Sequence, residues 1–266
     1  MEDRVNYLLF GSPPIGDIAA KHLLASHYPP AAVITDTKLS LDEQLDLVEK
    51  HKAGFILVVG YGRILKQALL DSVCGQVLNI HPSLLPLYRG PAPVVQALLD
   101  GVTETGVSLM EIDAEMDHGP LLAQETIPLS GKETPAELYA ILTFKGVQLF
   151  LDTVDAYLAE ELELTPQDHS EASYSHFIKK EDGILVPGED PAEMERKVRA
   201  FQGWPGTWIM DGEKRLIIQS AVVRNGRFEP VEVQPEGGKV MSFASYAAGK
   251  REKPEALLNR LFPTPA

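Results

Sequence analysis

Four short, continuously apolar runs near the start of the chain constrain its fold most strongly. They are NYLLF (6–10), AAVIT (31–35), FILVVG (55–60) and QVLNI (76–80). Such runs are typical of parallel strands that are covered on both faces. Between the second and third lies SLDEQLDLVEKHKA, whose Ser40 and Glu43 have the spacing of a capping box and predict a helix. Strands that alternate with helices predict an α/β fold with a Rossmann-like, mostly parallel sheet.

The character of the sequence changes after about residue 164. A long helix is expected before this point, over TPAELYAILTFKGVQLFLDTVDAYLAE, with Thr134 as its cap and Pro135 at its first position. The polar stretch TPQDHSEASYSH then predicts a linker. Beyond it come a short capped helix and strand-like runs, among them KVMSF, separated by the hairpin-turn dipeptides Asp211-Gly212, Asn225-Gly226 and Gly237-Gly238. We therefore predict a domain over 1–164, a linker over 165–176 and a smaller antiparallel sheet or OB-like β-barrel over 177–266.

The charge of the chain is strongly negative and unevenly distributed. The formal net charge is −14, and residues 1–164 hold 10 Lys and Arg against 23 Asp and Glu, whereas residues 165–266 hold 14 against 15. Binding to a polyanion is therefore expected to involve the second part or a local patch. One candidate patch comprises Lys179, Lys180, Arg196, Lys197 and Arg199, although interleaved acidic residues make a solvated helix face the favoured alternative.

Several protein classes are not expected from this composition. The acidic start, MEDRVNYLLFGSPP, differs from a basic signal peptide, and no apolar run is long enough to cross a membrane, so a cytoplasmic protein without a membrane partner is predicted. The single cysteine, Cys74, excludes an internal disulfide and is expected to be a small buried apolar residue. His169 and His176 lack a further ligand pattern, and we expect no metal.

The stretch VLNIHPSLLPLYRG (77–90) carries the strongest indication of chemistry. Its strand ends in Asn79 and His81, at the carboxyl end where parallel sheets bind ligands. The segment 106–124 adds Asp117 after another strand. An amide can hold an oxyanion, an imidazole can carry a proton, and a carboxylate can orient that imidazole. This set suits acyl transfer to an amine, while ordinary capping and a hydrogen-bonded strand end remain the alternative at this point.

The turn FGSPPIG (10–16) follows the first strand in the position of a nucleotide-binding loop. Pro13 and Pro14 have no backbone N–H to offer a phosphate, so a phosphate cradle is not expected. A rigid strand-to-helix turn is predicted instead, with Gly11, Ser12 and Pro13 as candidate substrate contacts.

Two motifs together resemble the folate-dependent formyltransferases. They are NIHPSLLPLYRG and, further on, EIDAEMDHGP. The resemblance implies the formyltransferase fold, 10-formyltetrahydrofolate as donor and an amine as acceptor. It also implies that Asn79 and His81 stabilise a tetrahedral oxyanion, and that Asp117 keeps His81 protonated and helps to move the proton.

The same resemblance assigns the residues around the donor. GYGRIL (60–65) and SLLP (83–86) resemble the family's pterin-binding walls. The cofactor-binding residues implied are Arg63, Ile64, Leu65, Ser83, Leu84, Leu85, Pro86 and Met116. Arg89 is a further candidate for binding the substrate, although Arg63 and Arg89 could equally pair with carboxylates of this acidic domain.

Within the family, the similarity to the methionyl-tRNA formyltransferase branch extends along nearly the whole chain. It includes RGPAPVVQAL, YSHFIKKEDG and RAFQGWPGTW, and it implies methionyl-tRNA as acceptor. The chain departs from that branch after Asp36, where a long basic loop, a helix and a strand are missing. An amino-sugar nucleotide is therefore the alternative acceptor, and a folate-binding protein without an acceptor is a third possibility. Trp204 and Trp208 are expected in a domain core rather than as a stacking platform for bases.

Overall fold

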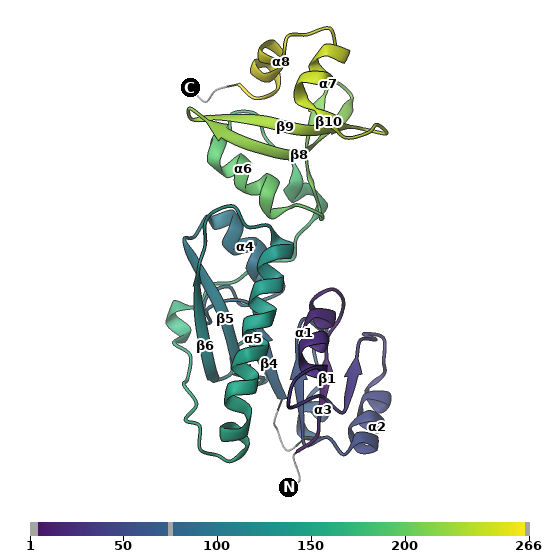
Figure 1. Cartoon of the computed structure of the whole chain (residues 1–266), viewed down its shortest axis with the longest axis vertical. Helices are drawn as coiled ribbons and strands as arrows, with labels where there is room; N and C mark the ends of the chain where they lie inside the picture. The colour runs from purple at the N-terminus through teal and green to yellow at the C-terminus, as the bar shows by residue number, and fades with distance from the viewer. Residues whose placement is uncertain (1–4, 74–76, 264–266) are drawn as a thin grey trace. The chain divides into compact units, whose positions relative to one another are not determined.

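The predicted strands form the parallel part of a six-stranded sheet (Figure 1). The computed structural model describes residues 5–73 and 77–263; Cys74 lies outside them. The sheet has the order β2-β1-β3-β4-β5-β6. Its strands are β1 Tyr7–Phe10, β2 Ala32–Ile34, β3 Phe55–Val58, β4 Val77–His81, β5 Glu104–Glu111 and β6 Leu121–Pro128. The first four are parallel, and β5 and β6 are antiparallel to their neighbours, which confirms a mostly parallel sheet.

The helices of this part of the chain follow the expected signals. They are α1 Ile15–Leu24, α2 Leu41–His51, α3 Gln67–Asp71, α4 Pro93–Asp100 and α5 Pro135–Leu158. Helix α2 begins with the predicted capping box, because the Ser40 side chain accepts from the Glu43 N–H and the Glu43 carboxylate accepts from the Ser40 N–H. Helix α5 begins at Pro135, as its sequence predicts.

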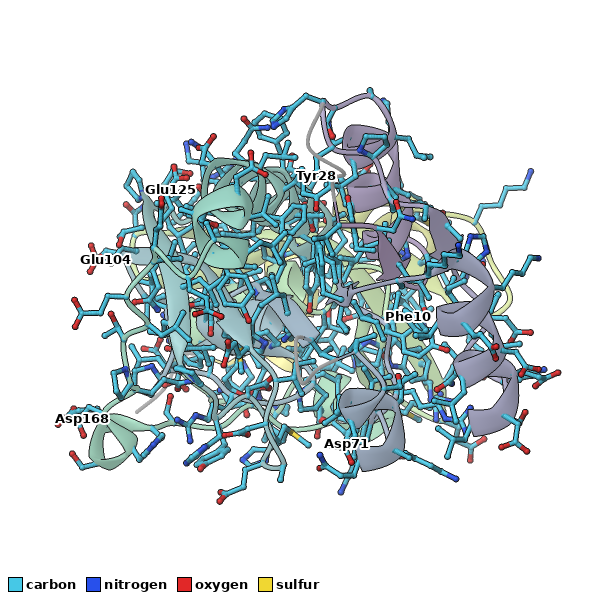
Figure 2. The ribbon with its side chains drawn as sticks, turned by 90° about the horizontal axis from the view of Figure 1, so that it is seen from below. Phe10, Tyr28, Asp71, Glu104, Glu125 and Asp168 are labelled. Atoms are coloured by element: carbon cyan, nitrogen blue, oxygen red, sulfur yellow. The ribbon has the colours of Figure 1, made fainter. Side chains whose placement is uncertain are left out.

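Two hydrophobic layers cover opposite faces of the sheet. On one face the Tyr7 and Phe55 rings stack, with centroids 4.9 Å apart, beside Phe150 of α5. On the other face Phe10 and its alternating neighbours pack against residues of α2 and α3. Figure 2 separates the layers, because Tyr28 lies among the rings near α5 whereas Phe10 lies on the side of α2 and α3.

The chain divides into two compact units. The first comprises the chain up to Val94, Thr103–Leu129 and Ala136–His176, and the second comprises Val95–Val102, Ser130–Pro135 and the chain from Phe177 onward. The second unit contains α6 Pro191–Ala200, β7 Thr207–Asp211, β8 Lys214–Arg224, β9 Arg227–Pro235, β10 Met241–Ser242, α7 Phe243–Gly249 and α8 Pro254–Leu261. Its strands form an antiparallel sheet of order β10-β9-β8-β7, so the predicted β-rich second part is confirmed.

The turns of the second unit agree with their sequence signals, but its last segment differs from the prediction. Asn225 and Gly226 both have positive φ, at 51° and 73°, as a two-residue hairpin turn requires. The run KVMSF was expected to be a strand, and only Met241–Ser242 pairs as one. Ser242 caps the next helix by accepting from the Ser245 N–H, so Phe243 already belongs to α7. None of the helices in the described ranges combines the length and apolarity needed to cross a membrane.

Candidate active site

Strand β4 presents Asn79 and His81 on one face of the sheet. Successive side chains of a strand point to opposite faces. Val77 belongs to the core beside α2 and α3, whereas Ile80 faces α5, where a Cβ added to Gly146 would lie 2.2 Å from its methyl group. Asn79 and His81 therefore share the face of Val77, opposite α5. Among the described residues, the Asn79 carboxamide has no hydrogen-bond partner, which leaves it able to bind a ligand oxygen.

Asp117 reaches His81 through a loop rather than from a neighbouring strand end. Strand β5 runs antiparallel to β4, so its last residue, Glu111, pairs with Leu78, which precedes Asn79 and lies farther from the end of β4. The loop between β5 and β6 then brings the Asp117 carboxylate to 3.6 Å from His81 Nδ1. Its other oxygen accepts from the Gly90 N–H at 2.7 Å. The sequence motif predicted this meeting of histidine and aspartate, and the structure brings the two side chains together.

Both ring nitrogens of His81 face acceptors. Nε2 lies 3.1 Å from the Tyr88 carbonyl oxygen, and Nδ1 faces the Asp117 carboxylate. A ring nitrogen that carries an N–H can donate to the acceptor that it faces. His81 is thus arranged as a hydrogen-bond donor in a largely buried site. The separation of 3.6 Å from Asp117 is wider than a hydrogen bond.

The loop after β4 is fastened by buried polar side chains. The Ser108 hydroxyl donates to the Ser83 carbonyl at 2.6 Å and accepts from the Leu85 N–H at 3.0 Å. The Gln124 carboxamide donates to the Leu85 carbonyl at 2.8 Å. The Ser83 hydroxyl is itself buried and donates to the Leu87 carbonyl. These contacts hold the loop in one conformation; the Ser83 side chain takes part in them, and the Leu85 side chain is buried.

The segment 165–176 packs along the same loop, within the first unit. The Tyr88 N–H donates to the Ser173 hydroxyl at 2.9 Å, and the Ala92 N–H donates to the Ser175 hydroxyl at 3.0 Å. Arg89 lies at the centre of this contact and is only 2% exposed. The predicted linker is thus an ordered part of the site's support.

The turn after β1 and the GYGRIL segment form the other side. The Ser12 hydroxyl donates to the Tyr61 carbonyl at 2.8 Å. The Tyr61 hydroxyl donates to the Asp36 carbonyl, and Arg63 donates to the carbonyl groups of Thr37 and Leu39. The short loop after Asp36 is therefore hydrogen-bonded to the GYGRIL segment.

The predicted ligand residues differ in what they expose. Ile64 is 80% exposed and Met116 52%, as an apolar wall for a ligand would be. Pro13 and Arg63 are exposed; Ser12, Leu65, Leu84 and Pro86 are half-buried; and Gly11, Ser83, Leu85 and Arg89 are buried. The binding roles of these residues remain predictions. Within the described part of the chain, no group of three or more His, Cys, Asp and Glu side chains could hold a metal.

Sequence reasoning missed three residues that contact His81 or Asp117. They are Gly90, Tyr88 and Gln167. Position was the only signal for Tyr88 and Gly90, which lie in the 77–90 motif itself. Gln167 gave no signal, because it lies far along the sequence in a polar stretch without periodicity.

Comparison with known proteins assigns the chain to a family. A family model described as formyl transferase matches residues 12–154, which is more than half of the chain. The chain belongs to the formyl transferase family. A methionyl-tRNA formyltransferase from Roseiflexus sp. (strain RS-1) is 36% identical over 219 residues, which cover 73% of this formyltransferase and 67% of the relative.

Two solved structures share the fold of this formyltransferase. Methionyl-tRNA formyltransferase from Clostridium thermocellum matches with a TM-score of 0.67 at 19% identity, covering 90% of this chain and 100% of that one. An N-formyltransferase from Helicobacter canadensis, in complex with folinic acid and dTDP-3-aminofucose, matches with a TM-score of 0.65 at 18% identity, covering 90% and 99%. The predicted fold class and family resemblance are therefore confirmed.

Proposed function

We propose that this enzyme transfers a formyl group from 10-formyltetrahydrofolate to the free amine of methionyl-tRNA. The observation that carries the proposal is the approach of Asp117 to His81 at the end of β4, on the strand face that also carries Asn79. The similarity to a methionyl-tRNA formyltransferase along most of the chain supports this acceptor. Such an acceptor would place the activity in the cytoplasm, where proteins are synthesised.

The chemistry needs only these three side chains and the two substrates. The amine attacks the formyl carbon, a C–N bond forms, and the formyl oxygen becomes an oxyanion. Asn79 donates a hydrogen bond to that oxygen, and His81 does so through Nε2 by exchanging the Tyr88 carbonyl for the oxyanion. This stabilisation is strongest in the transition state. The bond to N10 of the folate then breaks as the amine loses its proton and N10 gains one. Asp117, whose carboxylate lies 3.6 Å from His81 Nδ1, would carry this proton.

The donor is proposed to lie between the two sides of the site. The exposed side chains of Ile64 and Met116 would contact the flat pterin, and the loop at 83–86 would offer backbone groups. The folinic acid bound by the Helicobacter canadensis enzyme supports a folate in a fold of this kind. Burial of an exposed Ile side chain contributes about 1.5–3 kcal/mol when it is complete, so Ile64 alone would be a substantial donor contact.

The basic patch predicted in the second unit adds no support for a tRNA acceptor. In the predicted basic patch, Lys197 pairs with Glu189 at 2.8 Å and Arg199 pairs with Glu195 at 3.4 Å. These pairs favour the solvated helix face over a surface free to meet phosphates. Trp204 was expected in the core, and that prediction is wrong, because its side chain is exposed.

An amino-sugar nucleotide is the second candidate acceptor. The observation that favours it is the short loop after Asp36, which Tyr61 and Arg63 hold against the protein instead of extending toward a large substrate. The Helicobacter canadensis structure with dTDP-3-aminofucose has the same fold.

A direct competition assay tests the proposal. The wild-type protein receives 10-formyltetrahydrofolate with methionyl-tRNA and, separately, with a panel of amino-sugar nucleotides, and an Asp117→Asn preparation controls for contaminating enzymes. Transfer to methionyl-tRNA, weakening steeply with added salt, is the expected result. Transfer to a sugar alone would replace the acceptor and keep the chemistry. Transfer to none of them would contradict both assignments.

A further inference from the structure

Gln167 makes contacts that its position in the sequence did not suggest. It belongs to the segment 165–176, and its side chain is 6% exposed. Its Nε2 donates to the carbonyl oxygens of Asp117, at 2.9 Å, and Gly119, at 2.7 Å. Its Oε1 accepts from Arg89 Nε at 3.2 Å and Nη2 at 2.6 Å. If the amide were flipped, its NH2 group would face the Arg89 donors and its oxygen would face the two carbonyl oxygens. The contacts therefore fix its orientation.

The residue that Gln167 holds has an unusual backbone. Asp117 has a φ of 52°, in the left-handed region that L-residues seldom adopt. Such a conformation persists only when surrounding contacts favour it. Gln167 holds the Asp117 carbonyl, and the Gly90 N–H holds the carboxylate at 2.7 Å. Gly119 permits the tight return of the loop, because a Cβ there would lie 2.1 Å from the Glu111 carbonyl oxygen.

Arg89 holds the oxygen end of the Gln167 amide. Its guanidinium is buried against Gln167, and Nη2 also lies 2.8 Å from His169 Nδ1. Arg89 is therefore occupied within the protein, although its motif position suggested a substrate contact. Figure 2 labels Asp168, which precedes His169 in this supporting segment.

We propose that Gln167 is a positioning residue for formyl transfer, which holds Asp117 in the left-handed conformation that directs its carboxylate to His81. The proposal rests on the proposed function, because it assigns Asp117 its role in the proton movement. Gln167 acts through Asp117 and contacts neither substrate. The segment 165–176 then contributes to turnover as well as connecting two parts of the chain.

Two substitutions separate this role from simple anchoring of Arg89. Gln167→Glu retains an acceptor for Arg89 but replaces the donor to the Asp117 and Gly119 carbonyls with an oxygen. We expect Gln167→Ala and Gln167→Glu each to lower kcat about 100-fold, with little change in the donor KM. Near-normal turnover by Gln167→Glu would mean that Gln167 serves only as an anchor, and would overturn the proposal.

A double-mutant cycle tests whether the effect passes through Asp117. In an Asp117→Asn background, Gln167→Glu is expected to lower the remaining rate no further, because the carboxylate it positions is already gone. Multiplied losses would overturn the proposal. Gln96→Ala is the control, since the Gln96 side chain donates to the Asp100 carboxylate at an exposed position. It should leave turnover unchanged.

The rate of amide hydrogen exchange at Gly90 reports on the position of Asp117 without a catalytic assay. Its N–H donates to the Asp117 carboxylate, so displacement of Asp117 by Gln167→Glu should speed its exchange about tenfold while Gln96→Ala leaves it unchanged. An unchanged exchange rate in Gln167→Glu would refute the positioning role whatever the acceptor is. The wild-type transfer rate alone tests the proposed function, so the two can fail separately.

Discussion

Asp117 in the first unit and Asp211 in the second are both largely buried, yet their carboxylates are satisfied to different degrees. Asp211 accepts from the Tyr246 hydroxyl and pairs with Lys250 at 2.9 Å and Arg260 at 2.8 Å. Asp117 accepts one backbone N–H, and the His81 ring nitrogen stays 3.6 Å away. A carboxylate with all its partners in place stabilises the fold. A carboxylate with a hydrogen-bonding position still unfilled retains the capacity to take part in chemistry.

The largest effect is expected from removal of the charge at Asp117. Asn adopts the left-handed conformation nearly as readily as Asp, so Asp117→Asn should fold normally and bind folate. Loss of a proton carrier that also orients His81 should lower kcat roughly 10²–10⁴-fold. Single-turnover transfer measures the rate, and fluorescence titration measures folate binding. His81→Ala should behave similarly, and near-normal turnover by either variant would remove that residue from the mechanism.

The reverse pattern is expected at Asp211. Asp211→Asn leaves Lys250 and Arg260 without their shared acid at a side chain that is 5% exposed. Breaking such a network should lower the free energy of unfolding of the second unit by about 3 kcal/mol, at the low end for buried pairs because both cations are partly exposed. Both tryptophans, Trp204 and Trp208, lie in this unit, so urea titration followed by their fluorescence reports its unfolding.

A matched control sharpens the stability test. Glu213 is an exposed carboxylate two residues away, and Glu213→Gln should change the unfolding free energy by less than about 0.5 kcal/mol. Turnover by Asp211→Asn should stay normal while the protein is folded. If Asp211→Asn lowered turnover without loss of stability, the contrast between the two carboxylates would be wrong.

The pH dependence of this stabilisation follows from the shifted pKa of Asp211. Burial opposes ionisation, but hydrogen bonds from Tyr246, Lys250 and Arg260 outweigh it and lower the pKa to about 2. A carboxyl whose pKa is depressed on folding contributes stability above its unfolded pKa, about 3.9, and loses it as the pH falls through about 2. The full contribution, about 2–3 kcal/mol, should therefore be present at pH 5. The difference between wild type and Asp211→Asn should shrink between pH 4 and pH 2, and a constant difference would contradict this.

These comparisons also show what the sequence could predict. The apolar runs, the capping box and the turn dipeptides report contacts between near neighbours in the chain, and each predicted its element. Asn79, His81 and Asp117 were found because they lie in two compact motifs. Prediction failed at Ser242, where a helix cap ends the expected strand.

The supporting contacts could not be predicted, because they join distant residues without any pattern. Gln167 and Arg89 are separated by 78 positions, and a glutamine in a polar stretch is ordinary. Asp211 was visible only as part of a turn dipeptide, while its partners Lys250 and Arg260 lie far along the chain. Tertiary packing alone makes these side chains important.

The smallest effect is expected at a third aspartate, Asp113. It tests whether a short distance to a partner matters when the side chain is exposed. Its carboxylate lies 2.7 Å from His118 Nδ1. This is shorter than the distance from Asp117 to His81 and than the distances from Asp211 to Lys250 and Arg260. The Asp113 side chain is nevertheless 38% exposed. Exposed pairs typically contribute about 0–1 kcal/mol. Asp113→Asn should therefore change stability by less than about 0.5 kcal/mol and turnover by less than about twofold. The Asn side chain can still accept the Glu115 N–H that shapes the turn. A large loss of turnover with unchanged stability would show that Asp113 acts on the site through His118, and that exposure is a poor guide to function in this loop.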